Sequence, residues 1–357
     1  MTAILSRRLL LGGSVGAMVA GAVVAGGGNV QAADGATPVP ALPHRAITVG
    51  CWGGTYAAAL QAVIDGPLAA NAAITVTQNL TDEQARVTRL LSPGAGPRLD
   101  VAMLSDVDAY RMSLQQLFTP VTTDGVGMLT HVLPRLRVPY GVPQGSTALC
   151  IAYNPAKVAN APRGFAALFE AARKGMVGFS TELAIHNLAA AAIAQRDAGA
   201  SLQGAKSIFL ALKKAGTLRI YPTNEALGQA LASGEITMAP MWRSRGYVWQ
   251  QAQMDVRTSI PFEGAVPFTI MACVPHGGPA VGSAMQYLDA LLHPDAQVEM
   301  ARRLGLLSTV DNARIDAKLL AQIGFTAGQA IHFRPISLSA VAQTGVSLRR
   351  FWDHELA

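Results

Sequence analysis

The chain reads AITVGCWGGTYAAAL at residues 46–60, an apolar run that passes through paired glycines into an alanine-rich segment. Isoleucine, threonine and valine favour a strand over residues 46–51, and alanine and leucine favour a helix over 57–69. The pair Gly53–Gly54 permits a tight turn, and the Thr55 hydroxyl is expected to cap the helix. A strand that leads directly into a helix predicts the first unit of an α/β fold.

The same alternation continues along most of the chain. Segments rich in β-branched residues predict strands, and segments with apolar residues at helical spacing predict helices. Further strands are predicted at 73–77, 99–104, 176–179 and 218–221, and further helices at 82–91, 165–174, 187–197, 202–215 and 223–232. Strands separated by helices of this length favour mostly parallel sheets.

Two long apolar strands interrupt this alternation. One covers residues 148–154, after the glycine- and proline-containing segment 138–147, and the other covers 268–275. We interpret them as crossings between two lobes, with Gly145 and the strand into Cys273 as hinge candidates.

These crossings set the predicted domain boundaries. Lobe 1 is expected to comprise residues 45–143 and 268–357, and lobe 2 residues 144–267. After the second crossing, the pattern predicts helices at 281–292, 294–304 and 313–323.

Residues 1–33 have the features of an export signal. The arginine pair Arg7–Arg8 precedes an apolar, glycine- and alanine-rich run from Leu9 to Gly28, and residues 30–32 resemble a cleavage site. Paired arginines before a weakly apolar run indicate the twin-arginine export route. A membrane anchor is the alternative, although the run has fewer strongly apolar residues than the ~20 that a span requires. Residues 34–44 are predicted to form a tether.

The composition favours large apolar cores and few charged partners. Half of the residues are apolar and 14% are charged, and the roughly 320 residues after the signal favour two domains. The net charge is +6, without a dense Lys/Arg cluster, which disfavours nucleic-acid binding. Cys51, Cys150 and Cys273 allow one disulfide at most, or three buried thiols. No Cys/His spacing suits zinc, so no metal or cofactor is predicted.

A second informative stretch reads SGEITMAPMWRSR at residues 233–245. Gly234 suits the left-handed C-cap of the helix predicted at 223–232. A short strand is predicted at 235–239, and open α/β sheets hold their ligands beyond the ends of such strands.

Three side chains after this strand are candidates for ligand binding. Trp242 offers a flat apolar face, or alternatively fills the core. Arg243 and Arg245 suit bidentate recognition of a carboxylate or phosphate, or else form surface or inter-lobe salt bridges. If the run stays extended, the two arginines point to opposite faces, and one of them faces the ligand.

Other candidate side chains lie where predicted strands pass into helices or into other strands. Hydroxyl and backbone N–H groups at helix starts favour anionic or neutral polar groups, although each hydroxyl is also a typical helix cap. Asp106 and Asp108 suit a cation or a capping role. The remaining candidates are Thr55, Tyr56, Ser105, Ser146, Ser180 and Thr181.

Several motifs in a fixed order carry a family resemblance. They are WGGTY at 52–56, VPQGST at 142–147 with IAYN at 151–154, LASGEI at 231–236 with Met241–Trp242, FEGA at 262–265 with VPHGG at 274–278, and AMQYLDALL at 284–292 before Pro294. With these motifs, the chain resembles the extracellular solute-binding proteins of ABC importers, in the spermidine/putrescine-type branch of the type II class. The resemblance covers nearly all of the chain after the signal.

The resemblance implies a two-lobed type II periplasmic-binding-protein fold of the α/β class. Each lobe is expected to be a mostly parallel sheet flanked by helices, and two strand crossings join the lobes. Such a protein is a periplasmic receptor and not an enzyme. It captures a small-molecule solute between its lobes and delivers it to the cognate ABC permease in the inner membrane. A monomer without a nucleic-acid partner is expected.

The family's ligand residues carry over in part. Trp242 matches the tryptophan that packs on the ligand's aliphatic chain, and Phe268 matches an aromatic residue near the second crossing. The carboxylates that pair with ammonium groups in polyamine receptors fall on Thr181, Ile185 and Ile270. Because a buried ammonium without a carboxylate is unfavourable, these differences argue against a polyamine.

We therefore expect a small organic solute with an anionic group at Arg243 or Arg245 and an apolar part on Trp242. Three alternatives stay open: a polyamine receptor, a ferric-ion receptor and an enzyme on the same fold. A ferric site typically needs paired tyrosines, which the sequence lacks. An enzyme needs converging acid and base groups, and His186 is interpreted as a structural residue.

Overall fold

The computed structural model describes residues 45–92, 94, 96–195 and 201–356. The predicted signal (1–33) and tether (34–44) lie outside the described residues. The helical segments are α1 Gly54–Leu60, η1 Gln61–Asp65, α2 Gly66–Ala72, α3 Glu83–Leu91, α4 Asp106–Ser113, η2 Gly127–His131, η3 Pro134–Leu136, α5 Phe165–Ala172, η4 Thr181–Leu183, α6 Ala184–Ala194, α7 Lys206–Lys214, α8 Asn224–Ser233, α9 Arg243–Gln251, α10 Val281–Leu292, α11 Pro294–Leu304, α12 Ala317–Ile323, α13 Ala327–Ala330, α14 Leu338–Arg350 and η5 Phe351–Leu356.

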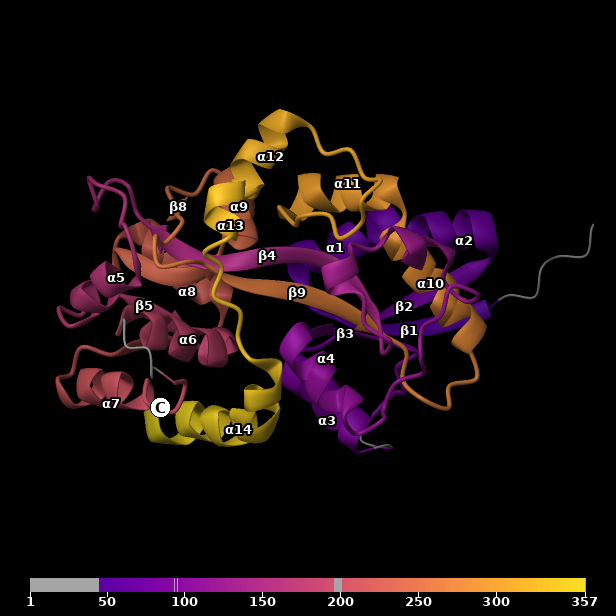
Figure 1. The fold of residues 1–357 in the computed structure, drawn as a ribbon, viewed down its shortest axis with the longest axis horizontal. Coiled ribbons are helices and arrows are strands. Elements are labelled where there is room, and N and C mark those ends of the chain that lie inside the picture. Colours follow the sequence, from indigo (N-terminus) through magenta and orange to yellow (C-terminus); the bar gives the residue numbers. More distant parts are fainter. Residues whose placement is uncertain (1–44, 93, 95, 196–200, 357) are drawn as a thin grey trace, which may run out of the picture. The chain divides into compact units, whose positions relative to one another are not determined.

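One seven-stranded sheet forms the centre of the described fold (Figure 1). Its order is β2-β1-β3-β9-β4-β7, and β8 pairs with β4. The strands are β1 Arg45–Cys51, β2 Ile74–Leu80, β3 Val101–Ser105, β4 Val142–Tyr153, β7 Met238–Trp242, β8 Arg257–Ser259 and β9 Val266–Cys273. A smaller parallel sheet pairs β5 (Gly178–Ser180) with β6 (Arg219–Tyr221).

The α/β class expected from the sequence is confirmed, but the main sheet is mixed. Strand β1 runs parallel to β2 and β3, as the strand–helix alternation predicts. Strand β9 runs antiparallel to both β3 and β4, and β4 runs antiparallel to β7. The long strands β4 and β9 therefore insert antiparallel pairs between the two βα-rich parts of the chain.

The pairing of β4 with β9 corresponds to the two crossings predicted from the sequence. It extends from Val142, opposite Ala272, to Leu149, opposite Val266, with an irregularity between Pro143 and Gly145. A side chain at Gly145 would approach Leu306 to within 3.0 Å, so glycine allows the close packing there. The lobe boundaries and the hinge role of Gly145 stay predictions.

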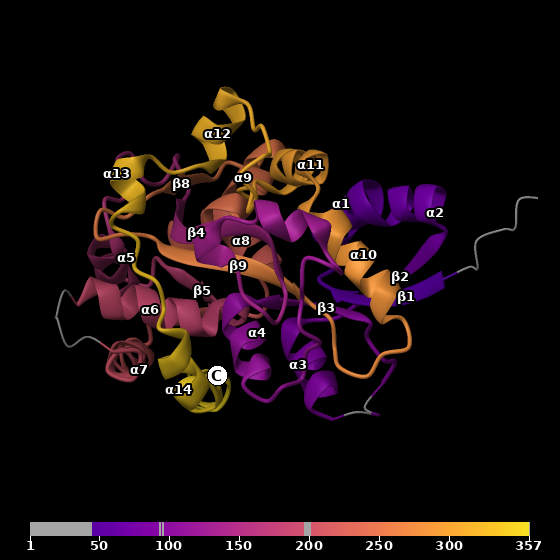
Figure 2. The same cartoon turned by 45° about the vertical axis from the view of Figure 1, so that its right-hand side comes forward.

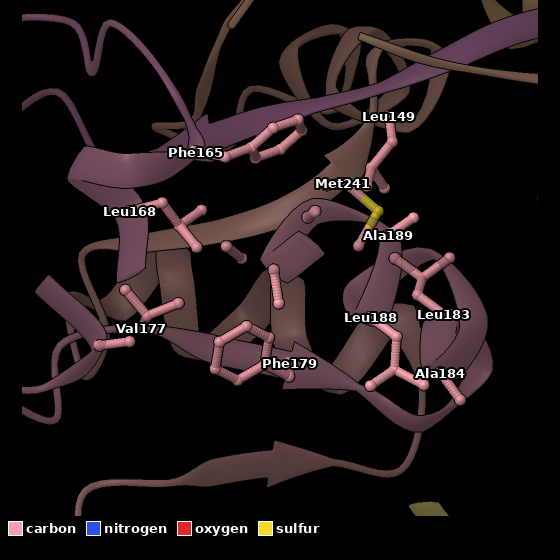
Figure 3. Close-up of a cluster of buried hydrophobic side chains, with 14 of the residues drawn as sticks. Leu149, Phe165, Leu168, Val177, Phe179, Leu183, Ala184, Leu188, Ala189 and Met241 are labelled. Carbon is pink, nitrogen blue, oxygen red and sulfur yellow. The ribbon is translucent and has the colours of Figure 1, made fainter. Parts of the chain in front are cut away.

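Two buried clusters flank this pair of strands. One gathers apolar side chains of α5, α6, β5 and their neighbours, including Phe165, Phe179 and Leu188 (Figure 3). The other gathers side chains of β1, β3, α10 and α11, including Val49 and Tyr287. Each βα-rich part of the chain thus buries a core of its own.

Helix α14 packs against the core of α5 and α6, and not against the core that its predicted lobe assignment implies. Its residues Val341 and Leu348 belong to the buried cluster of α5 and α6, although residues 268–357 were assigned to lobe 1. Helix α14 packs against both α4 and α6, and it lies beneath both of them in Figures 1 and 2.

Several local predictions need correction. Gly234 adopts the left-handed conformation at the end of α8 (φ 80°), as predicted, but the next strand covers Met238–Trp242 and not residues 235–239. The Thr55 cap is wrong, because Gly53 occupies the N-cap position of α1 without a side-chain hydrogen bond. The helix predicted from residue 313 begins at Ala317, where Asp316 caps it.

The three cysteines, Cys51, Cys150 and Cys273, are free and buried. Burial raises the pKa of Cys51 and of Cys150 to about 12, so both thiols stay protonated. No helix within the described ranges is long and apolar enough to cross a membrane.

Phe179→Ala is expected to reduce the free energy of unfolding by about 3–5 kcal/mol, because it leaves a cavity in a closed aromatic cluster. The Phe179 ring lies 5.7 Å from Phe169 and 5.0 Å from Phe209, centroid to centroid. Urea denaturation of the variant measures the loss. Ile331→Ala, at a side chain that is 77% exposed, is the control and should change stability by less than about 0.5 kcal/mol. Equal losses in both variants would contradict this account of the core.

Candidate functional site

A small cavity of about 140 Å³ lies at the carboxyl end of β3, where α4 begins. Asp106 and Val107 line it from α4, and His186 lines it from α6. Pro267 on β9, Pro335 and Ile336 before α14, and Leu338 at the start of α14 complete the lining. The cavity therefore lies where the start of α4, just after β3, meets helix α6 and strand β9.

An aromatic stack adjoins this cavity. Trp242, the last residue of β7, stacks on Phe268 of β9, with ring centroids 4.4 Å apart and planes at 20°. The His186 ring meets Trp242 edge-on at 4.6 Å and Phe268 at 5.8 Å. Trp242 and Phe268 are not themselves lining residues; the stack adjoins the cavity through His186, which lines it, and through Pro267, which precedes Phe268.

The Asp106 carboxyl group is held by backbone donors. It accepts hydrogen bonds from the amides of Val107 at 2.9 Å and Thr269 at 3.3 Å. Burial raises its pKa to about 7, and the hydrogen bonds only partly offset this effect. A cation in the cavity would favour the ionised carboxylate, because opposite charges lower the pKa of an acid.

His186 is the site residue that the sequence analysis missed. Burial lowers the pKa of its imidazole to about 3, helped by the nearby charge of Arg349, so the ring is neutral. Its Nε2 atom has no hydrogen-bond partner among the described residues. A buried polar atom without a partner at a cavity is typical of a position that a ligand completes. A lone histidine at the start of an alanine-rich helix gave no sequence signal for this role.

The predicted hydroxyl residues serve mainly the fold. Ser105 caps α4 by accepting from the amide of Asp108, and Ser180 accepts from the amide of Glu182. Ser146 donates to the carbonyl of Phe268 at 3.2 Å. The capping interpretation therefore holds for Ser105 and Ser180, whereas Ser146 secures the pairing of β4 with β9.

Thr55, Tyr56 and Thr181 lie outside the lining of the cavity. Thr55 is exposed in the first turn of α1. Tyr56 is buried and donates to Gln144 at 3.1 Å, and burial raises the pKa of its phenol. The Thr181 carbonyl accepts from Arg349 at 3.0 Å.

The two arginines of the 233–245 stretch belong to the first turn of α9 and not to an extended run. Their expected opposite orientation, which depended on that extended run, therefore does not apply. Arg245 pairs with Glu225 at 3.1 Å. Arg243 donates to the Ala321 carbonyl at 3.4 Å and lines a different cavity. Neither arginine lines the cavity beside Trp242.

A buried polar network supports the β3 end of the site. The Ser105 amide donates to Glu83 at 2.6 Å, and Asp108 pairs with Arg111 at 2.8 Å. Burial, with the charge of Asp108, raises the pKa of Glu83 to about 7. Within residues 45–356, and leaving aside the gaps, no group of three His, Cys, Asp or Glu side chains could hold a metal ion.

The sequence from residue 58 to 325 matches a family described as bacterial extracellular solute-binding protein. The chain belongs to this family. The family resemblance noted from the sequence motifs is thereby confirmed, without its spermidine/putrescine-type branch. The search of curated proteins finds no match.

Solved structures share the fold of this solute-binding protein at low sequence identity. The Atu4243-GABA receptor is 20% identical with a TM-score of 0.76, over 88% of this chain and 98% of its own. An ABC transporter substrate-binding protein from Bradyrhizobium japonicum USDA 110 is 18% identical with a TM-score of 0.76, over 88% and 100%. AgtB from A. tumefaciens R10, in complex with agropinic acid, is 18% identical with a TM-score of 0.75, over 87% and 98%.

Asp106→Asn is expected to raise the free energy of unfolding of the ligand-free protein at pH 8 by about 1–3 kcal/mol. The folded chain holds the Asp106 proton up to a pKa of about 7, whereas the unfolded chain releases it near 3.8. Folding therefore loses stability as the pH rises between these values, and the gain in the variant should vanish near pH 4. Denaturation curves across this range test the prediction. Asp124→Asn, at an exposed turn, is the control, and a gain independent of pH would contradict the prediction.

Proposed function

We propose that this chain is the periplasmic substrate-binding protein of an ABC importer, which captures a small organic solute and delivers it to a membrane permease without chemical turnover. Family membership supports the receptor role. The observation that carries the proposal is the cavity at which α4, α6 and β9 converge, with the Asp106 carboxyl group in its lining and the Trp242–Phe268 stack adjoining it through His186. Such a mixture of apolar walls and few polar groups is typical of small-molecule sites.

The proposed ligand carries a cationic nitrogen at Asp106 and an apolar part against the Trp242–Phe268 stack. This replaces the anionic group expected from Arg243 or Arg245, because neither arginine contributes to the cavity. The neutral imidazole of His186 offers a further donor or acceptor to a polar ligand atom. Neighbouring structures described as a GABA receptor and as a complex with agropinic acid support a small organic solute.

Calorimetric titration with matched solutes tests this function. The panel pairs each amine with the carboxylate of the same carbon skeleton and with the amino acid that carries both groups. Binding of amine-bearing solutes, with no binding of the simple carboxylates, supports the proposal. Tight binding of the carboxylates alone would contradict the assignment of Asp106, and conversion of any bound solute would contradict the receptor role.

Trp242→Ala is expected to weaken the affinity for the captured amine at least tenfold, because the apolar part of the solute loses its flat aromatic wall. Trp242→Phe keeps an aromatic face and should retain most of the affinity. Arg245→Gln is the control, since Arg245 pairs with Glu225 away from the cavity. Dissociation constants from calorimetry measure all three. An unchanged constant in Trp242→Ala would exclude the stack from the site.

The affinity for a cationic solute should fall about tenfold per pH unit below pH 7, because binding requires the ionised form of Asp106. The pKa of this carboxyl group is about 7 in the ligand-free protein. Asp106→Asn should bind more weakly at pH 8 and lose the pH dependence. Titrations at pH 5.5, 7 and 8.5 provide the measurement, and a wild-type affinity that does not change with pH would refute the role of Asp106.

A further inference from the structure

A second cavity, of about 630 Å³, lies between α9, β8 and α12. It shares no lining residue with the cavity beside Trp242. Arg243, Tyr247 and Gln250 line it from α9, and Arg257 and Gln322 line it from β8 and α12. Its volume falls within the usual range of small-molecule sites, about 300–1,000 Å³.

Arg243 is the partly buried charged group of this cavity, and it has no carboxylate partner among the described residues. Its guanidinium is partly buried, and burial lowers its pKa. The bond to the Ala321 carbonyl is long, at 3.4 Å, and the buried Nε has no partner among the described residues. The nearest ring, that of Phe325, lies 5.5 Å from the guanidinium carbon.

Several other arginines of the described residues pair with carboxylates. Arg245 pairs with Glu225 at 3.1 Å, and Arg303 pairs with Glu299 at 2.8 Å. For Arg243, no acidic group of the described residues lies within ion-pair distance. A partly buried charge without a partner lowers stability, so a protein gains from a ligand that supplies the opposite charge.

The balance of charge around the cavity is positive. Arg243 and Arg257 contribute two positive charges, against one negative charge from the exposed Asp255. Asp316 lies near Tyr247, but its carboxyl group caps α12 by accepting from the Leu319 amide at 2.8 Å. Gln250 and Gln322 add neutral amide donors at the rim.

We propose that this cavity is a second binding site, which takes a small organic molecule bearing a carboxylate or phosphate group. The planar guanidinium of Arg243 pairs with two oxygens of that group, and the glutamine amides hold the remainder of the molecule. We call the cavity beside Trp242 the solute cavity. The second site is separate from it, so the second site does not depend on the identity of the captured solute. The anion recognition predicted for the 233–245 stretch thus belongs to Arg243, on a cavity distinct from the one beside Trp242.

Thermal unfolding with probe anions tests this site. Phosphate, citrate and succinate are titrated at constant ionic strength, with chloride as the reference ion. A concentration-dependent rise in Tm, lost in Arg243→Gln and retained in Arg245→Gln, is the expected result. A preference for phosphate or for the two carboxylates identifies which oxyanion the site takes. No rise with any probe, or an equal rise in Arg243→Gln, overturns the proposal.

Two further variants separate ligand binding from structural support. Without added anion, Arg243→Gln should keep or raise the Tm, because it removes an unmatched charge, whereas a structural arginine would lower it. Arg243→Lys keeps the charge but not the two parallel donors, and it should weaken oxyanion binding about tenfold. Trp242→Ala should leave the oxyanion effect unchanged. Loss of the effect in Trp242→Ala with retention in Arg243→Gln would assign the anion to the solute cavity and refute a second site.

Discussion

The antiparallel pairing of β4 with β9 holds together the strands that carry the solute cavity. Ser105 lies opposite Ile270, Phe268 lies opposite Thr147, and Leu149 lies opposite Trp242. These pairs join β3, β9, β4 and β7 in turn. This pairing brings Asp106, which directly follows β3, near the ring of Trp242, more than 130 positions later in the sequence. A slip of one residue in β9 would turn Phe268 to the other face and separate the carboxyl group from the stack.

Local sequence patterns were sufficient for the parts of the fold that depend on neighbouring residues. The strand at 46–51 and the helix that ends at Gly234 follow from composition and turn chemistry, whereas the ligand-binding role of Trp242 and Phe268 stays a prediction. The helix start at Arg243 escaped prediction because the short run after Pro240 fits a strand end and a helix start equally well. That difference of one element places both arginines in the first turn of α9, outside the lining of the cavity beside Trp242.

Long-range packing accounts for the rest of what sequence patterns missed. In the sequence, His186 is an ordinary residue just before a predicted helix. In the folded chain its ring contacts Trp242 of β7 and Phe268 of β9, which no local pattern predicts. Helix α14 gives an amphipathic pattern with no indication of its partners, and only the folded chain sets it against α4 and α6. Ile336, just before α14, and Leu338, its first residue, then line one side of the cavity.

The surroundings of Asp65, a buried carboxyl group away from both cavities, can be compared with those of Asp106 and Arg243. Asp65 is as deeply buried as the core, and the fold supplies donors to both of its oxygens, from Gln78 at 2.6 Å and Tyr287 at 3.0 Å. Both oxygens of Asp106 also accept hydrogen bonds, from the Val107 and Thr269 amides. Asp106 and Arg243, like Asp65, have no oppositely charged side chain within ion-pair distance in the described part of the chain, but each of the two lines a cavity. Asp106 and Arg243 therefore differ from Asp65 in lying where a ligand can enter. An ionised Asp106 at one cavity and Arg243 at the other would favour ligands of opposite charge.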